Sequence, residues 1–256
     1  MQLSSLMLYK LLLVFTLLAV LMGTTDAGGT GEDNAATNIN NELKSFLTIP
    51  YRTDGALDEH GNWTLFADTS SRFNTPGLNC SGLVLAASRL ILNKNISISD
   101  AKRDRLNDSG QDAPNGEDWD FGWDFIMNIS DGHKRRFLLP NNQTGDPDNA
   151  TAATYRGYDL ANVRTRKELV SRFKRGHLYL LSFNSESRRA GYNLIHYHVG
   201  LVYVSPMNEA WLYQTTHQSK VANRRDLNSA KGWESFHNSF IINGGEKRLL
   251  VLEVDL

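Results

Sequence analysis

The sequence predicts an α+β domain in which a helix near residue 80 packs on an antiparallel sheet. Apolar residues recur at helical spacing from about Cys80 to Asn93. After Val163 the pattern changes to short apolar, β-prone runs separated by turn residues. Strands that follow helices along the chain in this way favour an antiparallel sheet over a parallel one.

The N-terminal segment has the pattern of a signal peptide. Residues 1–10 carry one positive charge and no acid, Leu11–Met22 is an apolar run, and Thr25-Asp26-Ala27 offers small residues for cleavage. The apolar run is short for a membrane span, although an uncleaved anchor is the alternative. We therefore expect residues 1–27 to be a signal peptide, the protein to be secreted or periplasmic, and no membrane attachment after cleavage.

The remaining chain has the size of one domain with a substantial core. Residues 28–42 are rich in Gly, Asn and Thr, and this composition predicts a disordered leader before a single domain over 43–256. The net charge of −1 gives no reason to expect a nucleic-acid partner. We expect a monomer.

Cys80 is the only cysteine of this chain. In an exported protein a single cysteine cannot form an internal disulfide, so it is either a buried small side chain or a reactive one. Asn79 is a favourable N-cap residue, which places Cys80 in the first turn of the predicted helix. The helix dipole and the free N–H groups there favour a thiolate, and we predict a catalytic nucleophile.

We expect the segment from about 94 to 162 to be an insertion between the helix and the sheet. It has a marked excess of acids, with aromatic residues interleaved among them. Aromatic faces and carboxylates suit a sugar or a cationic peptide group, so Trp119, Trp123 and Asp120 are candidate substrate-binding residues of a lid or wall. The alternative is a solvated extension with a few anchoring aromatics.

The C-terminal part predicts one short helix and then a sheet. Arg164–Lys174 is a basic helix candidate ended by Gly176. The predicted strands are Leu178–Phe183, Tyr197–Val204, Trp211–Thr216, Phe240–Ile242 and Arg248–Val254. His198 lies within the second strand, where a rigid backbone would hold a catalytic base, and Gly200 leaves space beside it.

These segments resemble motifs of the NlpC-type papain-fold cysteine peptidases. Asn79-Cys80-Ser81-Gly82-Leu83-Val84 is similar to their Asp-Cys-Ser-Gly-Phe/Leu-Val motif, and His198-Val199-Gly200-Leu201-Val202 to their His-Val-Gly-Ile-Tyr strand. Arg175–Tyr179 is similar to the strand that precedes the histidine. The order of cysteine before histidine also matches. Asn79 and His177 stand where the family usually has Asp, and the family's upstream tyrosine is not evident.

The resemblance implies an exported hydrolase that cleaves amide bonds in peptidoglycan stem peptides without metal or cofactor. Cys80 would be the nucleophile and His198 the general base. Gln214 would orient the histidine, with His217 in reserve for this role. The backbone N–H groups of Cys80 and Ser81 would form the oxyanion hole.

Two other functions fit parts of the sequence. His196 and His198 alternate on one predicted strand and, with His217, could hold zinc in a metal-dependent hydrolase. An exported carbohydrate- or wall-binding module would instead use Trp119, Trp123 and Trp211 as stacking surfaces around a merely buried cysteine.

Overall fold

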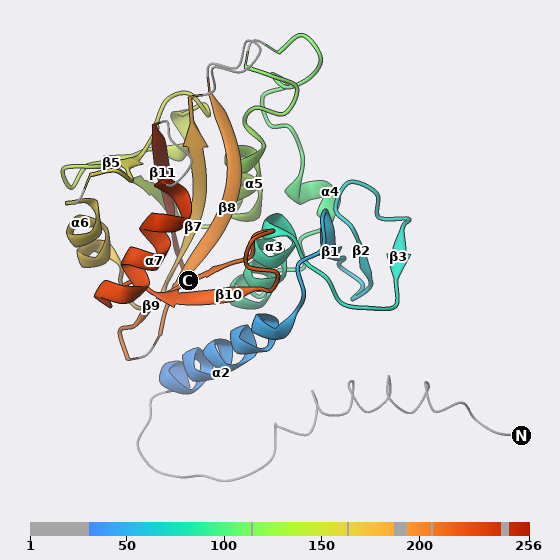
Figure 1. Cartoon of the computed structure of the whole chain (residues 1–256), viewed down its shortest axis with the longest axis horizontal. Helices are drawn as coiled ribbons and strands as arrows, with labels where there is room; N and C mark the ends of the chain where they lie inside the picture. Colours follow the sequence, from blue (N-terminus) through green and yellow to red (C-terminus); the bar gives the residue numbers. More distant parts are fainter. Residues whose placement is uncertain (1–30, 114, 163, 187–193, 206, 242–245) are drawn as a thin grey trace, which may run out of the picture. The chain divides into compact units, whose positions relative to one another are not determined.

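The computed structural model describes residues 31–113, 115–162, 164–186, 194–205, 207–241 and 246–256 (Figure 1). Helices pack on a large antiparallel sheet, so the predicted α+β class is confirmed. The predicted signal peptide, residues 1–27, lies outside the described residues. Within the part of the chain that is described, no helix is both long and apolar enough to cross a membrane.

The helices are α2 (Gly31–Ser45), α3 (Cys80–Leu92), α4 (Ile98–Ala101), α5 (Phe121–Ile129), α6 (Thr165–Arg172) and α7 (Ala230–Ile241), with 3-10 turns η2 (Phe46–Thr48) and η3 (Pro147–Asn149). The strands are β1 (Gly55–Leu57), β2 (Trp63–Leu65), β3 (Arg72–Phe73), β4 (Arg135–Leu138), β5 (Thr144–Gly145), β6 (Tyr158–Asp159), β7 (His177–Ser185), β8 (Ile195–Val204), β9 (Ala210–Gln214), β10 (Asn223–Asp226) and β11 (Lys247–Asp255).

The main sheet has the order β10-β9-β8-β7-β11-β4-β5, with β6 also paired to β11. Alternate residues of its central strands enter two different cores. Leu178 and Leu180 of β7 pack in the core beneath α3 and α5, whereas Tyr179 and Leu181 pack in the core beneath α6 and α7. The sheet is therefore covered by helices on both faces (Figure 1). Strands β1, β2 and β3 form a separate small sheet.

Helix α3 begins and ends as its sequence predicts. The Asn79 side chain accepts a hydrogen bond from the Gly82 N–H at 2.7 Å, and Asn93 closes the helix in the left-handed conformation. The helix is buried along most of its length, which fits its apolar composition. A Cβ on Gly82 would overlap the carbonyl oxygen of Gly55, so the glycine allows the first turn to lie directly against β1.

The predicted disordered leader is in part helical. Residues 31–42 belong to α2, which continues to Ser45. Leu43 is fully buried in the core beneath α3 and α5, and the Tyr213 hydroxyl donates to Asn40 Oδ1 at 3.4 Å. The polar composition does not predict this helix. Two buried side chains, Asn40 and Leu43, attach its C-terminal half to the rest of the domain.

The segment 94–162 is not an insertion outside the sheet. Its β4 pairs with β11 over Arg135–Leu138, and its α5 contacts β7 and β8. Phe125 and Ile126 of α5 are fully buried. This segment therefore supplies both an outer part of the sheet and one of the two helices that cover the face shared with α3.

Four of the five predicted strands of the C-terminal part form as β7, β8, β9 and β11. The predicted strand Phe240–Ile242 is wrong in its described part, because Phe240 belongs to α7. Trp233, Phe236 and Phe240 are buried at helical spacing on one face of α7. The short apolar run at the end of this helix has the same composition as a buried strand, and periodicity alone does not distinguish the two.

Candidate functional site

The thiol of Cys80 lies against the open edge of β8. Strand β9 pairs with β8 only over Leu201–Val204, so the N-terminal half of β8 has no neighbour on that side among the described strands. The imidazole of His198 and the backbone N–H of Val199 both act to lower the pKa of the thiol. Cys80 packs against the core that contains Val199 of β8, and α3 contacts both β8 and β9.

The environment of Cys80 favours its thiolate. Burial raises the pKa of the thiol, but the hydrogen bond and the charge of His198 outweigh this, together with the Val199 N–H and the Ser81 hydroxyl. The net effect lowers the pKa of Cys80 to about 7. The residue keeps part of its surface exposed and forms no disulfide. A partly exposed cysteine with a lowered pKa has the properties of a reactive nucleophile.

Aromatic side chains hold the ring of His198. The centroid of the imidazole lies 5.1 Å from that of Phe183 on β7 and 5.5 Å from that of Phe240 on α7. Its Nε2 atom is buried and has no hydrogen-bond partner among the described residues. The ring therefore helps to lower the pKa of Cys80. Its Nε2 atom remains available for an orienting group. No pattern in the sequence indicates the contact with Phe240, which depends on α7.

Gln214 lies at the end of β9 on the face that His198 uses. It follows Tyr213, which pairs with Leu201, and it shares the face of Leu212, which packs in the core beneath α7. Its side chain is fully buried, yet neither amide atom has a hydrogen-bond partner in the described structure. Buried amides without partners are costly, so this one is a candidate to bind either the free His198 nitrogen or a ligand.

His217 has a different environment. It is exposed, and its ring meets that of Tyr51 edge-on, with 5.7 Å between centroids. Tyr51 forms a parallel bridge with Leu78, two residues before Cys80. Sequence reasoning missed Tyr51, because only the folded chain brings it beside the loop that carries the cysteine.

The predicted zinc-binding set is wrong. A bulge in β8 makes Phe183 pair with His198 and Asn184 with His196, so the two histidines point to opposite faces of the sheet. His196 is buried, with Nδ1 2.8 Å from the Ser182 hydroxyl and Nε2 3.0 Å from the Ala152 carbonyl. Among the described residues, no group of three or more His, Cys, Asp or Glu side chains is placed to hold a metal.

The expectation that Trp119, Trp123 and Asp120 bind substrate is also corrected. Trp119 and Trp123 are only 5% and 2% exposed and belong to the core beneath α3 and α5. Asp120 is fully buried and accepts a hydrogen bond from the Ser109 hydroxyl at 2.7 Å. Burial, opposed by this hydrogen bond and reinforced by Asp108, raises the pKa of Asp120 to about 6. These aromatic faces are not available to stack on a sugar.

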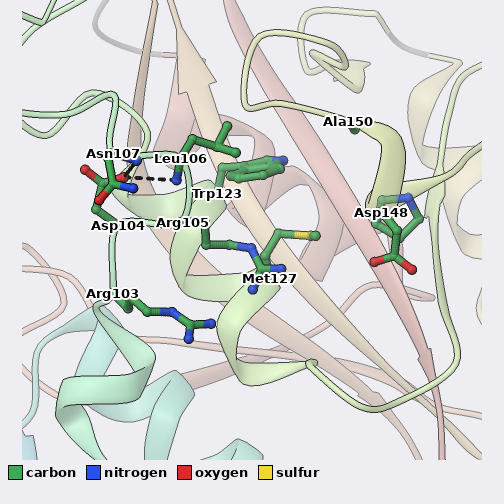
Figure 2. Close-up of a pocket in the computed structure, with 10 residues that line it drawn as sticks. Arg103, Asp104, Arg105, Leu106, Asn107, Trp123, Met127, Asp148 and Ala150 are labelled. Carbon is green, nitrogen blue, oxygen red and sulfur yellow. Dashed lines mark hydrogen bonds between the residues drawn. The ribbon is translucent and has the colours of Figure 1, made fainter.

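A pocket of about 470 Å³ lies next to this core (Figure 2). It is lined by the loop of residues 103–107, by Trp123 and Met127 of α5, and by the turn that contains Asp148 and Ala150. Its lining includes neither Cys80 nor His198. The pocket is therefore separate from the candidate catalytic site.

No protein-family model matches the chain, and no curated protein matches it. Among solved structures, the chain is similar to protein LPG0564 from Legionella pneumophila str. Philadelphia 1, described with the family model DUF1460. The TM-score is 0.47 and the sequence identity 14%, over 87% of this chain and 89% of that chain.

Proposed function

We propose that the protein is an exported cysteine hydrolase that cleaves amide bonds in peptidoglycan stem peptides. The observation that carries the proposal is the position of Cys80 in the first turn of α3, under the influence of His198, which helps to lower the pKa of the thiol to about 7 in spite of burial. A nucleophile activated by an adjacent base is the minimum requirement for covalent amide hydrolysis. The resemblance of the Cys80 and His198 motifs to NlpC-type peptidases supports the choice of substrate.

In the first half of the reaction, His198 holds the proton of the Cys80 thiol, and the thiolate attacks the amide carbonyl carbon. The oxyanion that forms accepts hydrogen bonds from the backbone N–H groups of Cys80 and Ser81. First-turn N–H groups have no partner within a helix, and Asn79 already takes that of Gly82. His198 then donates its proton to the leaving nitrogen, the C–N bond breaks, and a thioester remains on Cys80.

In the second half, a water molecule attacks the thioester carbon while His198 accepts one of its protons. The C–S bond then breaks and a carboxylate is released. The Gln214 amide oxygen, which has no partner among the described residues, would accept the Nε2–H of His198 and fix its tautomer. The paired His198 and Cys80 are then restored for the next turnover.

The binding-module alternative has less support. It required Trp119 and Trp123 as exposed stacking surfaces, and both are buried. The third tryptophan, Trp211, is partly covered by the guanidinium of Arg224, whose Cζ lies 4.0 Å from the ring centroid.

The decisive experiment is incubation with purified peptidoglycan, followed by mass spectrometry of the released fragments. We expect the wild-type protein to release fragments with new amine and carboxylate ends, and Cys80→Ala to release none. His217→Ala serves as a matched histidine control that keeps activity. Equal release by Cys80→Ala and wild type, or no release by the wild type, would reject the proposal.

A further inference from the structure

Arg225 and Asn223 extend the face of the sheet that carries Gln214. On the edge strand β10, Asn223 pairs with Gln214 and Arg225 with Leu212. Directly paired residues of antiparallel strands point to the same face. The two β10 side chains therefore lie on the same side of the sheet as Gln214 and His198, and both are half-buried.

Arg225 is a cation with no ion-pair partner among the residues that the structure describes. Its Nη1 atom is buried and has no hydrogen-bond partner, and no ion pair involves Arg225 among the described residues. Burial lowers the pKa of the Arg225 guanidinium, and no neighbouring carboxylate opposes this. A half-buried charge of this kind is costly unless a ligand neutralises it.

The neighbours of Arg225 add complementary groups. The Oδ1 atom of Asn223 is a buried acceptor without a partner in the described structure, and the Gln214 amide is unsatisfied next to it. A guanidinium recognises a carboxylate, and amide oxygens recognise N–H donors. A peptide with a free carboxylate near an amide N–H presents both groups together.

We propose that Arg225 and Asn223 form a subsite for a carboxylate of the peptide substrate. The inference rests on the proposed function, because it assigns the site's ligand as a peptide. In a stem peptide the carboxylate has two sources, the α-carboxylate of a γ-linked glutamate and the C-terminal carboxylate. Arg225 would bind one of them in a charge-assisted, bidentate manner.

The adjacent Arg224 supplies a matched control. It pairs with Tyr213, lies on the opposite face of β10, and packs over the Trp211 ring. Substituting Arg224 removes the same charge from the same strand without touching the face of Gln214.

The test measures binding of synthetic Ala-γ-Glu-Lys peptides to the full chain carrying Cys80→Ala, which prevents turnover. Three probes are compared by calorimetry: the free acid, the peptide with a glutamate α-carboxamide, and the peptide with a C-terminal carboxamide. We expect one amidated peptide to bind about 10-fold more weakly than the free acid, a loss typical of a charge-assisted hydrogen bond. Arg225→Gln should abolish this difference, Arg225→Lys should retain part of it, and Arg224→Gln should leave it unchanged.

Equal affinity of the free acid and both amidated peptides overturns the inference. A difference in affinity that persists in Arg225→Gln overturns it too, as does an absence of binding by the free acid at millimolar concentration. Circular dichroism of each variant confirms its folding. Because binding is measured without turnover, the two proposals fail separately. Peptidoglycan cleavage without carboxylate discrimination rejects the subsite alone, and discrimination without cleavage rejects catalysis alone.

Discussion

Gly82 packs against the carbonyl of Gly55, so that the first turn of the cysteine helix and the strand β1 are in direct backbone contact. The Asn79 N–H donates to the same carbonyl at 2.8 Å. The glycine two residues after Cys80 is thus required by packing, and its position fixes where the thiol lies relative to β8.

We predict that Gly82→Ala lowers both stability and thiol reactivity. The added methyl group overlaps backbone that has little freedom to move, and overpacking of this kind costs about 1–3 kcal/mol. Thermal unfolding and the rate of Cys80 alkylation measure the two effects. Gly200→Ala is the control, since a Cβ there meets the nearest atoms, Leu212 Cδ1 and Tyr213 O, at 3.5 Å. Equal unfolding temperatures for Gly82→Ala and wild type would contradict this account.

A second prediction concerns the titration of Cys80. The rate of alkylation by iodoacetamide should rise with pH through a midpoint near 7, because the thiolate is the reacting species and the pKa is lowered to about 7. In His198→Ala the midpoint should move above 7, since only the Val199 N–H and the Ser81 hydroxyl then oppose the effect of burial. The label is unambiguous because the chain has one cysteine. A wild-type midpoint near 8.5, the ordinary value for a thiol, would argue against activation by His198.

The third prediction tests the orienting role of Gln214. Gln214→Ala should lower kcat about 10- to 1000-fold with a smaller effect on KM, by analogy with orienting members of catalytic triads. Steady-state kinetics on a defined stem peptide provides the measurement. His217→Ala, at an exposed position, should change neither constant appreciably. The opposite pattern, a silent Gln214→Ala and an inactive His217→Ala, would transfer the role to His217.

The fourth prediction concerns stability and pH. Burial, followed by the nearby Asp120, raises the pKa of the Asp124 carboxyl to about 8. A raised pKa in the folded state contributes stability at low pH that is lost as pH rises towards 8. Asp124→Asn removes that loss, so its Tm relative to wild type should increase by about 2–4 °C between pH 5 and pH 9.

Scanning fluorimetry across this range provides the test, with Asp112→Asn as the control because Asp112 is exposed in the segment that precedes α5. The Arg105 N–H, 3.3 Å from both Asp124 carboxylate oxygens, keeps an acceptor in the asparagine variant. A Tm difference that does not change with pH would show that the Asp124 carboxyl titrates at its ordinary pKa.

Local patterns were sufficient for the cysteine helix and for strands β7, β8, β9 and β11, but not for β4, β5, β6 and β10. Asn79, Cys80 and Gly82 are close in sequence, and the chemistry of a helix N-terminus depends on neighbours along the chain. The errors came from long-range packing. Trp119 and Trp123 stand among acids in the sequence, yet tertiary contacts bury them, and nothing local distinguishes a buried aromatic from an exposed one in a polar segment.

The proposed pairing of Cys80 with His198 follows from motif order, whereas the surroundings of the two residues do not. Phe240 reaches the imidazole only because α7 returns across the sheet, and Arg225 reaches the same face through the register of β10 with β9. The register of β10 and the position of α7 are set by the whole fold. Single sequence motifs therefore cannot predict them.

At the bulge in β8, His196 and His198 pair with two consecutive residues of β7, Asn184 and Phe183. Tyr197, which lies between the two histidines, has no pairing partner on β7. Removing Tyr197 would restore the regular ladder and leave each imidazole opposite its present neighbour. Strand β8 therefore accommodates one more residue than β7 at this position. A sequence alignment that treats β8 as a regular strand, with no gap at Tyr197, would assign the residues before Tyr197 to the wrong face of the sheet.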